Sequence, residues 1–169
     1  MEHEKAEAAA GQLLEAVGRE AFAYAWQLLR HREDALDAVQ AAMVATWRHR
    51  NRLRAERNSR GWFYRVLRNQ CLDRLRARAA HPAAALDTDL ADRAAREPID
   101  DVVGHESIER LRLAFETLPD PMREILLLRD FHDLAYAEIA EALEVPVGTV
   151  MSRLHRARAL LRERLLANE

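Results

Sequence analysis

The sequence predicts an all-α protein of two small helical domains joined by a flexible linker. Three observations support this fold class. Alanine, leucine and arginine are abundant, whereas the 169 residues include only five glycines and five prolines, which favours helices. No segment shows the alternation of polar and apolar residues that marks a half-buried strand. Two helical patterns flank an acidic stretch with few large apolar residues, so we expect domains at 9–79 and 107–169 and a linker at 80–106.

The N-terminal domain is predicted to contain three helices, because apolar residues recur there at intervals of three and four. The expected helices span about residues 9–29, 32 or 34 to 51, and 62–78. The polar stretch 50–60, with five arginines and two asparagines, is expected to be a loop. Trp62 and Cys71 are expected in the core, since they repeat with the apolar residues of the third helix.

The C-terminal domain is predicted to contain four helices. They span about residues 108–118, 121–131, 136–143 and 147–166. Pro121 suits the first turn of its helix, and Pro146 prevents the third helix from running on. The last two helices form a helix-turn-helix, and the polar, arginine-bearing face of the second fits a DNA major groove. The alternative is a pair of packed helices with a solvated basic face.

Charge is distributed in blocks along a chain whose net charge is −2. Residues 48–78 hold eleven arginines and two acids, and residues 145–169 hold five arginines and two acids. The stretch between these basic blocks, 81–144, is acidic. Basic blocks attract the phosphates of nucleic acid. We expect the acidic stretch to repel DNA, or to pair with the basic blocks when DNA is absent.

The sequence gives no indication of a catalytic or metal site. Cys71 is the only cysteine, and the seven histidines are scattered without ligand spacing, so we assign no metal and no cofactor. No nucleophile elbow, phosphate loop or recognisable acid–base pair is present, which predicts that the protein is not an enzyme. The acidic start, with Glu2 and Glu4, and the lack of a long apolar run predict a cytoplasmic protein.

The helix-turn-helix carries the most specific pattern in the chain. Residues 145–158 are VPVGTVMSRLHRAR, and residues 118–128 are LPDPMREILLL. These segments resemble the C-terminal helix-turn-helix, and the helix leading into it, of extracytoplasmic-function sigma factors in the sigma-70 superfamily. The resemblance implies a sigma region 4-like domain that binds the −35 promoter element. The residues implied to contact DNA are Thr149, Ser152, His155 and Arg156, with Arg153 and Arg158 nearer the phosphates.

Two N-terminal segments resemble the same family. Residues 34–40 (DALDAVQ) and 45–48 (ATWR) resemble the helix that docks on the polymerase clamp, and residues 61–76 (GWFYRVLRNQCLDRLR) resemble the next helix. The resemblance implies a region 2-like domain. The residues implied to bind core polymerase are Asp34, Asp37, Gln40 and Trp47. The alternative is that the acids among them belong to an ordinary solvated helix face. Implied to bind the −10 element are Asn51, Arg60, Arg65, Arg68, Asn69, Arg74 and Arg76.

The sequence departs from the family pattern at several positions. Ala135 stands where a capping Ser or Thr is usual, which costs about 1 kcal/mol of helix stability. Glu144 stands where Gly is usual, and it is strained if its φ is positive. Met151 replaces a residue that is often basic. In the clamp-docking helix the departures are Leu36, Ala41 and Ala42.

The resemblance implies an alternative sigma factor that binds core RNA polymerase and promoter DNA under the control of an anti-sigma factor. Two other interpretations remain open. The chain could be a stand-alone helix-turn-helix regulator, which would bind duplex DNA without polymerase. It could also be a sigma-like decoy, which would bind an anti-sigma protein but not polymerase.

Overall fold

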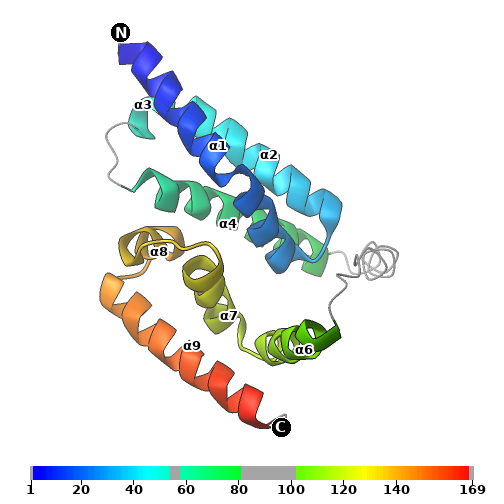
Figure 1. Ribbon diagram of the computed structural model, residues 1–169. Coiled ribbons are helices and arrows are strands. Elements are labelled where there is room, and N and C mark those ends of the chain that lie inside the picture. Colours follow the sequence, from blue (N-terminus) through cyan, green and yellow to red (C-terminus); the bar gives the residue numbers. More distant parts are fainter. Residues whose placement is uncertain (1, 54–57, 81–101, 168–169) are drawn as a thin grey trace.

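The computed structural model describes residues 2–53, 58–80 and 102–167, and within these ranges the chain is helical without any strand (Figure 1). The helices are α1 (Glu2–Leu29), α2 (Arg32–Arg48), α3 (Arg50–Leu53), α4 (Ser59–Ala80), α6 (Val102–Glu116), α7 (Asp120–Leu126), the π-helical turn η2 (Leu127–Phe131), α8 (Tyr136–Leu143) and α9 (Val147–Ala167). The all-α prediction is confirmed. In the described part of the chain, every helix is too short or too polar to cross a membrane.

Helices α1, α2 and α4 pack against one another in the N-terminal half. Small residues of α2, repeating at Ala35, Ala38 and Ala42, are fully buried and allow close approach of its neighbours. The largest fully buried side chains of α1 and α4 are Tyr24, Phe63, Tyr64 and Leu67. Helix α2 begins where His31 Nδ1 accepts a hydrogen bond from the Asp34 backbone N–H at 3.2 Å, which caps its first turn.

Helices α7, α8 and α9 pack together in the C-terminal half and form the predicted helix-turn-helix. Helix α8 spans the predicted residues 136–143. The Glu138 carboxylate accepts a hydrogen bond from the Ala135 N–H at 2.8 Å, but alanine has no oxygen to return to the helix, so half of the usual capping box is present. Glu144 ends α8 with φ 55° and ψ 46°, so the expected strain at this left-handed position is confirmed.

Several predicted boundaries differ from the structure. Helix α1 extends back to Glu2, because its first turns contain good helix formers although they lack large apolar residues. The expected loop 50–60 is helical at both ends, in α3 and from Ser59, while residues 54–57 lie outside the described residues. Helix α6 begins at Val102, inside the predicted linker 80–106, of which residues 81–101 lie outside the described residues.

Two predictions about the core were wrong. Trp62 is only half-buried, with its ring 5.9 Å from that of His49, because the adjacent Phe63 and Tyr64 face the interior of the domain instead. The apolar spacing of the last helix also predicts that Val147 packs against the helix before it. Val147 is 43% exposed, since it lies in the first turn of α9 beyond the end of α8. The expectation for Cys71 is confirmed, because it is a fully buried free thiol.

The two halves share one connected apolar core, which passes from α1 and α4 into α7, α8 and α9. Figure 1 shows α4 between the N-terminal helices and α8, and the α4–α8 contact is extensive. Gly61 of α4 makes this contact possible. A Cβ atom at Gly61 would lie 2.6 Å from the Glu138 carbonyl oxygen and 2.9 Å from the Glu138 Cα.

Candidate nucleic-acid interface

The outer face of α9 carries most of the residues predicted to contact the −35 element. The exposed members are Ser152, His155 and Arg156, and the half-buried members are Thr149 and Arg153. Buried on the opposite side of α9 are Val150, Leu154 and Ala157. Figure 1 shows α9 along the edge of the molecule that lies away from α1 and α2. The structure therefore leaves this polar face exposed, and a helix such as α9 is narrow enough to enter a DNA major groove.

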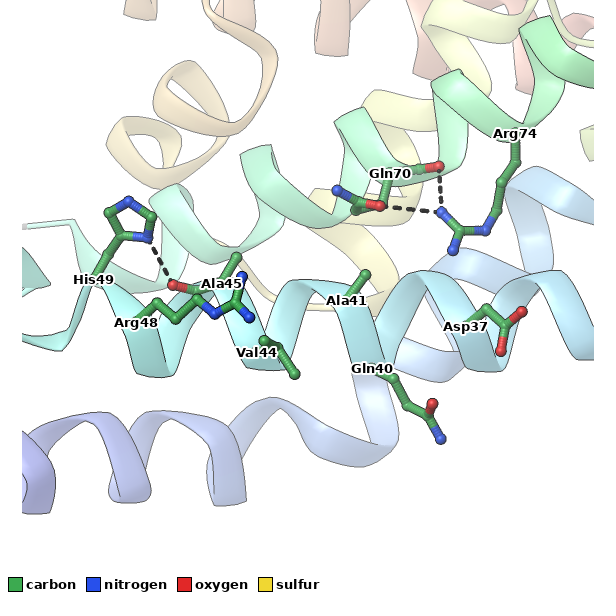
Figure 2. Close-up of a pocket in the computed structure, with 9 residues that line it drawn as sticks. All are labelled: Asp37, Gln40, Ala41, Val44, Ala45, Arg48, His49, Gln70 and Arg74. Atoms are coloured by element: carbon green, nitrogen blue, oxygen red, sulfur yellow. Dashed lines mark hydrogen bonds between the residues drawn. The ribbon is translucent and has the colours of Figure 1, made fainter.

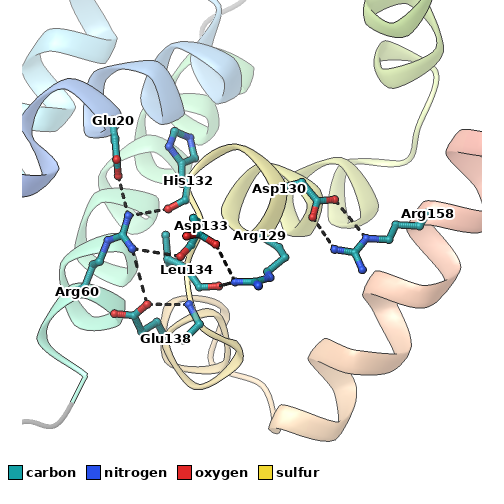
Figure 3. A network of polar contacts seen from close by, with 10 residues as sticks. Glu20, Arg60, Arg129, Asp130, His132, Asp133, Leu134, Glu138 and Arg158 are labelled. Atoms are coloured by element: carbon teal, nitrogen blue, oxygen red, sulfur yellow. Dashed lines mark hydrogen bonds and ion pairs between the residues drawn. The ribbon is translucent and has the colours of Figure 1, made fainter.

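Hydrogen bonds within α9 order part of this face. The Ser152 hydroxyl donates to the Thr149 carbonyl at 3.1 Å, and Arg156 Nε donates to the Ser152 carbonyl at 3.3 Å. Arg158 donates instead to the two carboxylate oxygens of Asp130, at 2.5 and 3.3 Å (Figure 3). These hydrogen bonds raise the pKa of Arg158. Arg158 is held against η2, so the phosphate contact predicted for it requires this ion pair to open.

Arg60, predicted to act at the −10 element, lies in a polar network between the two halves (Figure 3). Its Nη2 donates to the Glu20 carboxylate at 2.7 Å and to the His132 carbonyl at 2.6 Å. Its Nη1 donates to the Asp133 carbonyl at 3.4 Å and lies 3.9 Å from the Glu138 carboxylate. The Arg60 guanidinium is therefore directed at the C-terminal half.

His132 follows η2 and packs its ring against two tyrosines of the N-terminal half, which also contact each other with their ring centroids 5.4 Å apart. The ring centroid lies 5.9 Å from that of Tyr24 and 5.8 Å from that of Tyr64. The side chain is buried, and His132 Nδ1 has no hydrogen-bond partner among the described residues. Burial lowers the pKa of His132, and the charge of Arg60 adds to this effect against the opposing charge of Glu20.

Arg68 forms a well-buried ion pair with Glu124 of α7. Its Nε donates to Glu124 Oε1 at 2.7 Å and its Nη2 donates to Oε2 at 3.3 Å, while the Tyr24 hydroxyl donates to Oε1 at 2.8 Å. The side chains of Arg68 and Glu124 are only 23% and 11% exposed. Burial opposes the charge of Arg68, but the hydrogen bonds to Glu124 outweigh it and raise the pKa of Arg68. Burial and the Glu124 charge raise the pKa of Tyr24.

The other residues predicted to bind the −10 element divide between different surfaces. Arg65 Nη1 lies 2.8 Å from a Glu141 carboxylate oxygen of α8. Arg74 donates to the backbone and side-chain oxygens of Gln70, at 3.0 and 3.1 Å, within α4. The exposed members are Asn51, Asn69 and Arg76. The arginines at 60, 65 and 68 therefore face the C-terminal half, and the structure does not bring the predicted set together on one open surface.

Residues predicted to bind polymerase lie on the exposed side of α2. Asp37 and Gln40 are exposed and line a groove of about 580 Å³ between α2 and α4 (Figure 2). Asp34 is less available, because its carboxylate lies 2.6 Å from Arg78 Nη2. Trp47 is 43% exposed on the same helix.

Apolar side chains accompany these polar groups on α2. Leu36, Val44 and Trp47 are between 41% and 49% exposed and repeat at helical spacing along the helix. The guanidinium of Arg50 lies 5.2 Å from the Trp47 ring centroid, in a cation–π arrangement. Exposed apolar groups rimmed by polar ones are typical of surfaces that bind another protein.

Metal chemistry finds no support in the described residues, where no cluster of three or more histidine, cysteine or carboxylate side chains could hold an ion. Burial raises the pKa of Cys71 to about 12, so this thiol is poorly suited to act as a thiolate ligand.

Both halves of the chain match known protein families. Residues 13–81 match Sigma-70 region 2, and residues 108–161 match Sigma-70, region 4. The chain is 31% identical over 143 residues to the ECF RNA polymerase sigma-E factor of Haemophilus influenzae, a match that covers 79% of this chain and 76% of that protein. The chain belongs to the extracytoplasmic-function (ECF) family of RNA polymerase sigma factors. This is a family of transcription regulators rather than enzymes.

Other ECF sigma factors show the same relationship. The SigM factor of Mycobacterium tuberculosis is 37% identical over 134 residues, which are 78% of this chain. The chain spans 64% of the length of that relative. The solved structure of the sigma factor RpoE in complex with the anti-sigma factor NepR from Bartonella quintana superposes with a TM-score of 0.68 at 22% identity, covering 94% of this chain and 98% of that one. The fold is therefore that of the ECF sigma factors.

The ECF motifs did not identify the groups that cover the α4 arginines. Glu20, Tyr24 and Glu124 lie far from α4 in sequence, and their positions carry no pattern that distinguishes them from other helical residues. One available signal was the alternation of charge, because the acidic stretch 81–144 lies between two basic blocks. The expectation that this stretch can pair with a basic block is confirmed for Glu124 and for the acids of α8.

Proposed function

We propose that this protein is an alternative sigma factor that binds core RNA polymerase and directs transcription from a particular class of promoters. The main support is that region 2 and region 4 segments occur in order in one chain, with the recognition face of α9 open to solvent. A sigma factor needs both parts, because it must contact two promoter elements and the polymerase together.

Region 4 is proposed to bind the −35 element as duplex DNA through α9. Ser152, His155 and Arg156 would face the base edges, and Arg153 would lie near a phosphate. Arginine offers two parallel donors to the O6 and N7 acceptors of guanine, so Arg156 is the side chain best suited to choose a base. Thr149 would face DNA beside them, and Arg158 would lie near a phosphate once its ion pair with Asp130 opens.

Region 2 is proposed to bind the −10 element after the strands separate, through α4 and the segment before it. The cations of this block, with Arg60, Arg65 and Arg68 among them, suit the backbone of a single strand. The polar amides of Asn51 and Asn69 would contact base edges. Arg74 and Arg76 extend the same basic helix toward its C-terminal end.

The exposed side of α2 is proposed to bind core polymerase. Asp37, Gln40 and Trp47 are exposed there, and the neighbouring Leu36 and Val44 add apolar area. Asp34 would take part once its ion pair with Arg78 opens. We place the protein in the cytoplasm, where polymerase acts, and propose an anti-sigma partner, since the related RpoE was solved in complex with one.

Run-off transcription with purified core polymerase on a promoter library tests this proposal. The expected result is a set of start sites that appear only when the protein is added and that share two upstream elements. Asp37→Ala should weaken binding to core polymerase, while Asp73→Ala, an exposed acid of α4 outside the proposed surface, serves as the matched control.

Two other outcomes would contradict the proposal. Binding to duplex DNA as a dimer without any gain in transcription would favour a stand-alone regulator. Binding to an anti-sigma protein but not to core polymerase would favour a sigma-like decoy.

A further inference from the structure

Met151 is an exposed apolar side chain on the face of α9 that is proposed to bind DNA. The side chain is 55% exposed and lies in the second turn of the helix, directly before Ser152 and one turn before His155. Val147, one turn earlier on the same side, is 43% exposed. The two apolar side chains therefore lie beside residues that are proposed to face the base edges of the −35 element.

The position of Met151 matters more than its exposure. A single exposed methionine needs no explanation on an ordinary surface, because soluble proteins expose many apolar atoms. Met151 is not needed to pack α9, since Val150, Leu154 and Ala157 are buried on the other side of the helix. Recognition helices contact base edges with their N-terminal residues. Binding of α9 in a major groove would therefore remove Met151 from water and place it against a base.

The chemistry of the methionine side chain favours one base. Its thioether is a weak acceptor and has no donor, so it cannot pair with the acceptors of guanine. Thymine is the one base that presents a methyl group in the major groove. Packing this methyl group against the thioether removes apolar area from water on both sides, whereas a polar base edge in its place would lose hydrogen bonds to water.

The charges around Met151 indicate that this position contributes base choice rather than attraction to phosphate. Met151 is neutral, so its contact releases no counterion from DNA. Arg153 is proposed to lie near a phosphate, and Arg156 offers donors to guanine, so α9 carries cations for these tasks elsewhere. A basic residue at position 151, as is usual in the family, would instead donate to guanine or to a phosphate.

We propose that Met151 selects a thymine in the −35 element, because its side chain packs against the thymine methyl group and Val147 extends this apolar contact. The proposal rests on the proposed binding of α9 to the −35 duplex. The promoters of this sigma factor would then differ, at one base pair, from those bound by relatives that have a basic residue at this position.

Removal of single methyl groups from the DNA tests the proposal. Duplexes that bind the protein, alone and with core polymerase, are first selected from a random library to identify the −35 element. Each thymine of that element is then replaced in turn by uracil, which pairs with adenine in the same way and lacks only the methyl group. Fluorescence anisotropy should show an affinity loss of about fourfold at one position, as expected for one buried methyl group.

Variants of Met151 show whether this loss comes from the proposed contact. With Met151→Ala, thymine and uracil should bind equally well at that position, whereas Met151→Leu keeps an apolar side chain of similar volume and should retain the preference. Leu166→Ala is the matched control, because Leu166 is 61% exposed near the end of α9 and should leave the preference unchanged. Alanine and leucine both favour helix, so none of these changes should weaken α9.

A methylated cytosine separates the methyl group from the rest of the base. When a cytosine–guanine pair replaces the selected thymine–adenine pair, affinity for the wild-type protein should fall. Replacing that cytosine by 5-methylcytosine should raise the affinity again by about fourfold, because the same methyl group returns on a base with a different hydrogen-bonding edge.

The outcomes distinguish this proposal from the proposed function. The methyl contact is overturned if the selected element contains no thymine, if Met151→Ala leaves every loss on uracil unchanged, or if 5-methylcytosine recovers no affinity, even when the wild-type protein directs transcription. If the free protein selects duplexes through this contact but core polymerase gains no start sites, the proposed function fails and the methyl contact stands. If no duplex is selected with or without polymerase, both fail.

Discussion

The two basic surfaces of this molecule differ in what surrounds them. The face of α9 points outward, and most of its predicted contact residues are exposed or half-buried. The basic face of α4 points inward, and three of its arginines are paired with carboxylates from the other half. The two helices carry similar residue types, but the basic face of α9 is exposed, whereas the arginines of α4 are paired with carboxylates.

The difference teaches that basic charge in a sequence does not by itself identify an open nucleic-acid surface. An arginine that holds a carboxylate in a partly dry interface must break that contact before it can bind a phosphate. Arg158 shows the same effect on a smaller scale within region 4, where Asp130 holds it against η2. Four predictions sharpen the contrast between the two surfaces.

The largest effect is expected when the buried pair on α4 is broken. Glu124→Gln should lower the free energy of unfolding by about 2–3 kcal/mol, because Arg68 keeps its charge without a carboxylate partner and the Tyr24 hydroxyl loses a charged acceptor. Urea unfolding followed by circular dichroism measures this change. Asp73→Asn breaks an exposed pair with Arg76 on the same helix and should cost less than about 0.5 kcal/mol. Equal losses would show that the Arg68–Glu124 interface is not tightly packed in solution.

The next effect concerns the open surface. Arg156→Ala should weaken binding to a −35 duplex by about 1–3 kcal/mol, which is about fivefold or more, and relax the choice of one base pair. Fluorescence anisotropy on a promoter identified by run-off transcription, with single-base variants, measures both changes. Arg164→Ala, exposed near the end of α9, should weaken all duplexes by a similar small amount. A uniform loss in Arg156→Ala would assign that residue to phosphate contact.

A smaller change is expected at the start of α8, which separates the two surfaces. Ala135→Ser supplies the missing capping oxygen opposite Glu138 and should raise the free energy of unfolding by about 1 kcal/mol. Ala137→Ser, exposed inside the same helix, should lower it slightly because serine is a weaker helix former. A gain at both positions would mean that capping is not the cause.

The smallest effect is expected from pH, through His132. Burial lowers the pKa of this histidine where the two halves pack together, so its contribution to the interface between them is complete above the ordinary histidine pKa and declines as pH falls below it. The groups that face it are Glu20, Arg60 and the two tyrosines. Lowering the pH from neutral to about 5.5 should increase the radius of gyration of the free protein, measured by small-angle X-ray scattering.

His132→Phe keeps a ring against Tyr24 and Tyr64 but cannot take up a proton. Its radius of gyration should therefore change less with pH than that of the wild type. If the two proteins respond identically, other groups control the pH dependence of the interface.

Sequence patterns predicted the helices well where they are long and amphipathic. Helix α8 has the predicted bounds, and the strain at Glu144 and the missing cap at Ala135 followed from comparing the ends of this helix with the family pattern. Sequence patterns did not predict helices that are too short, or too poor in large apolar residues, to show a period. Helix α3 is a single turn, too short for a period, and the first turns of α1 have helix propensity without large apolar residues.

The sequence by itself determined the helical architecture and the helix-turn-helix, because periodicity, capping and turn chemistry act within a few residues. Its resemblance to the family also supplied the residues predicted to bind DNA. Only the tertiary structure decided which of those residues are free. Glu124 has two partners, Arg68 and Tyr24, which lie 56 and 100 positions away from it in the chain. Such pairing depends on how whole helices pack, and packing across these distances leaves no repeating pattern in a single sequence.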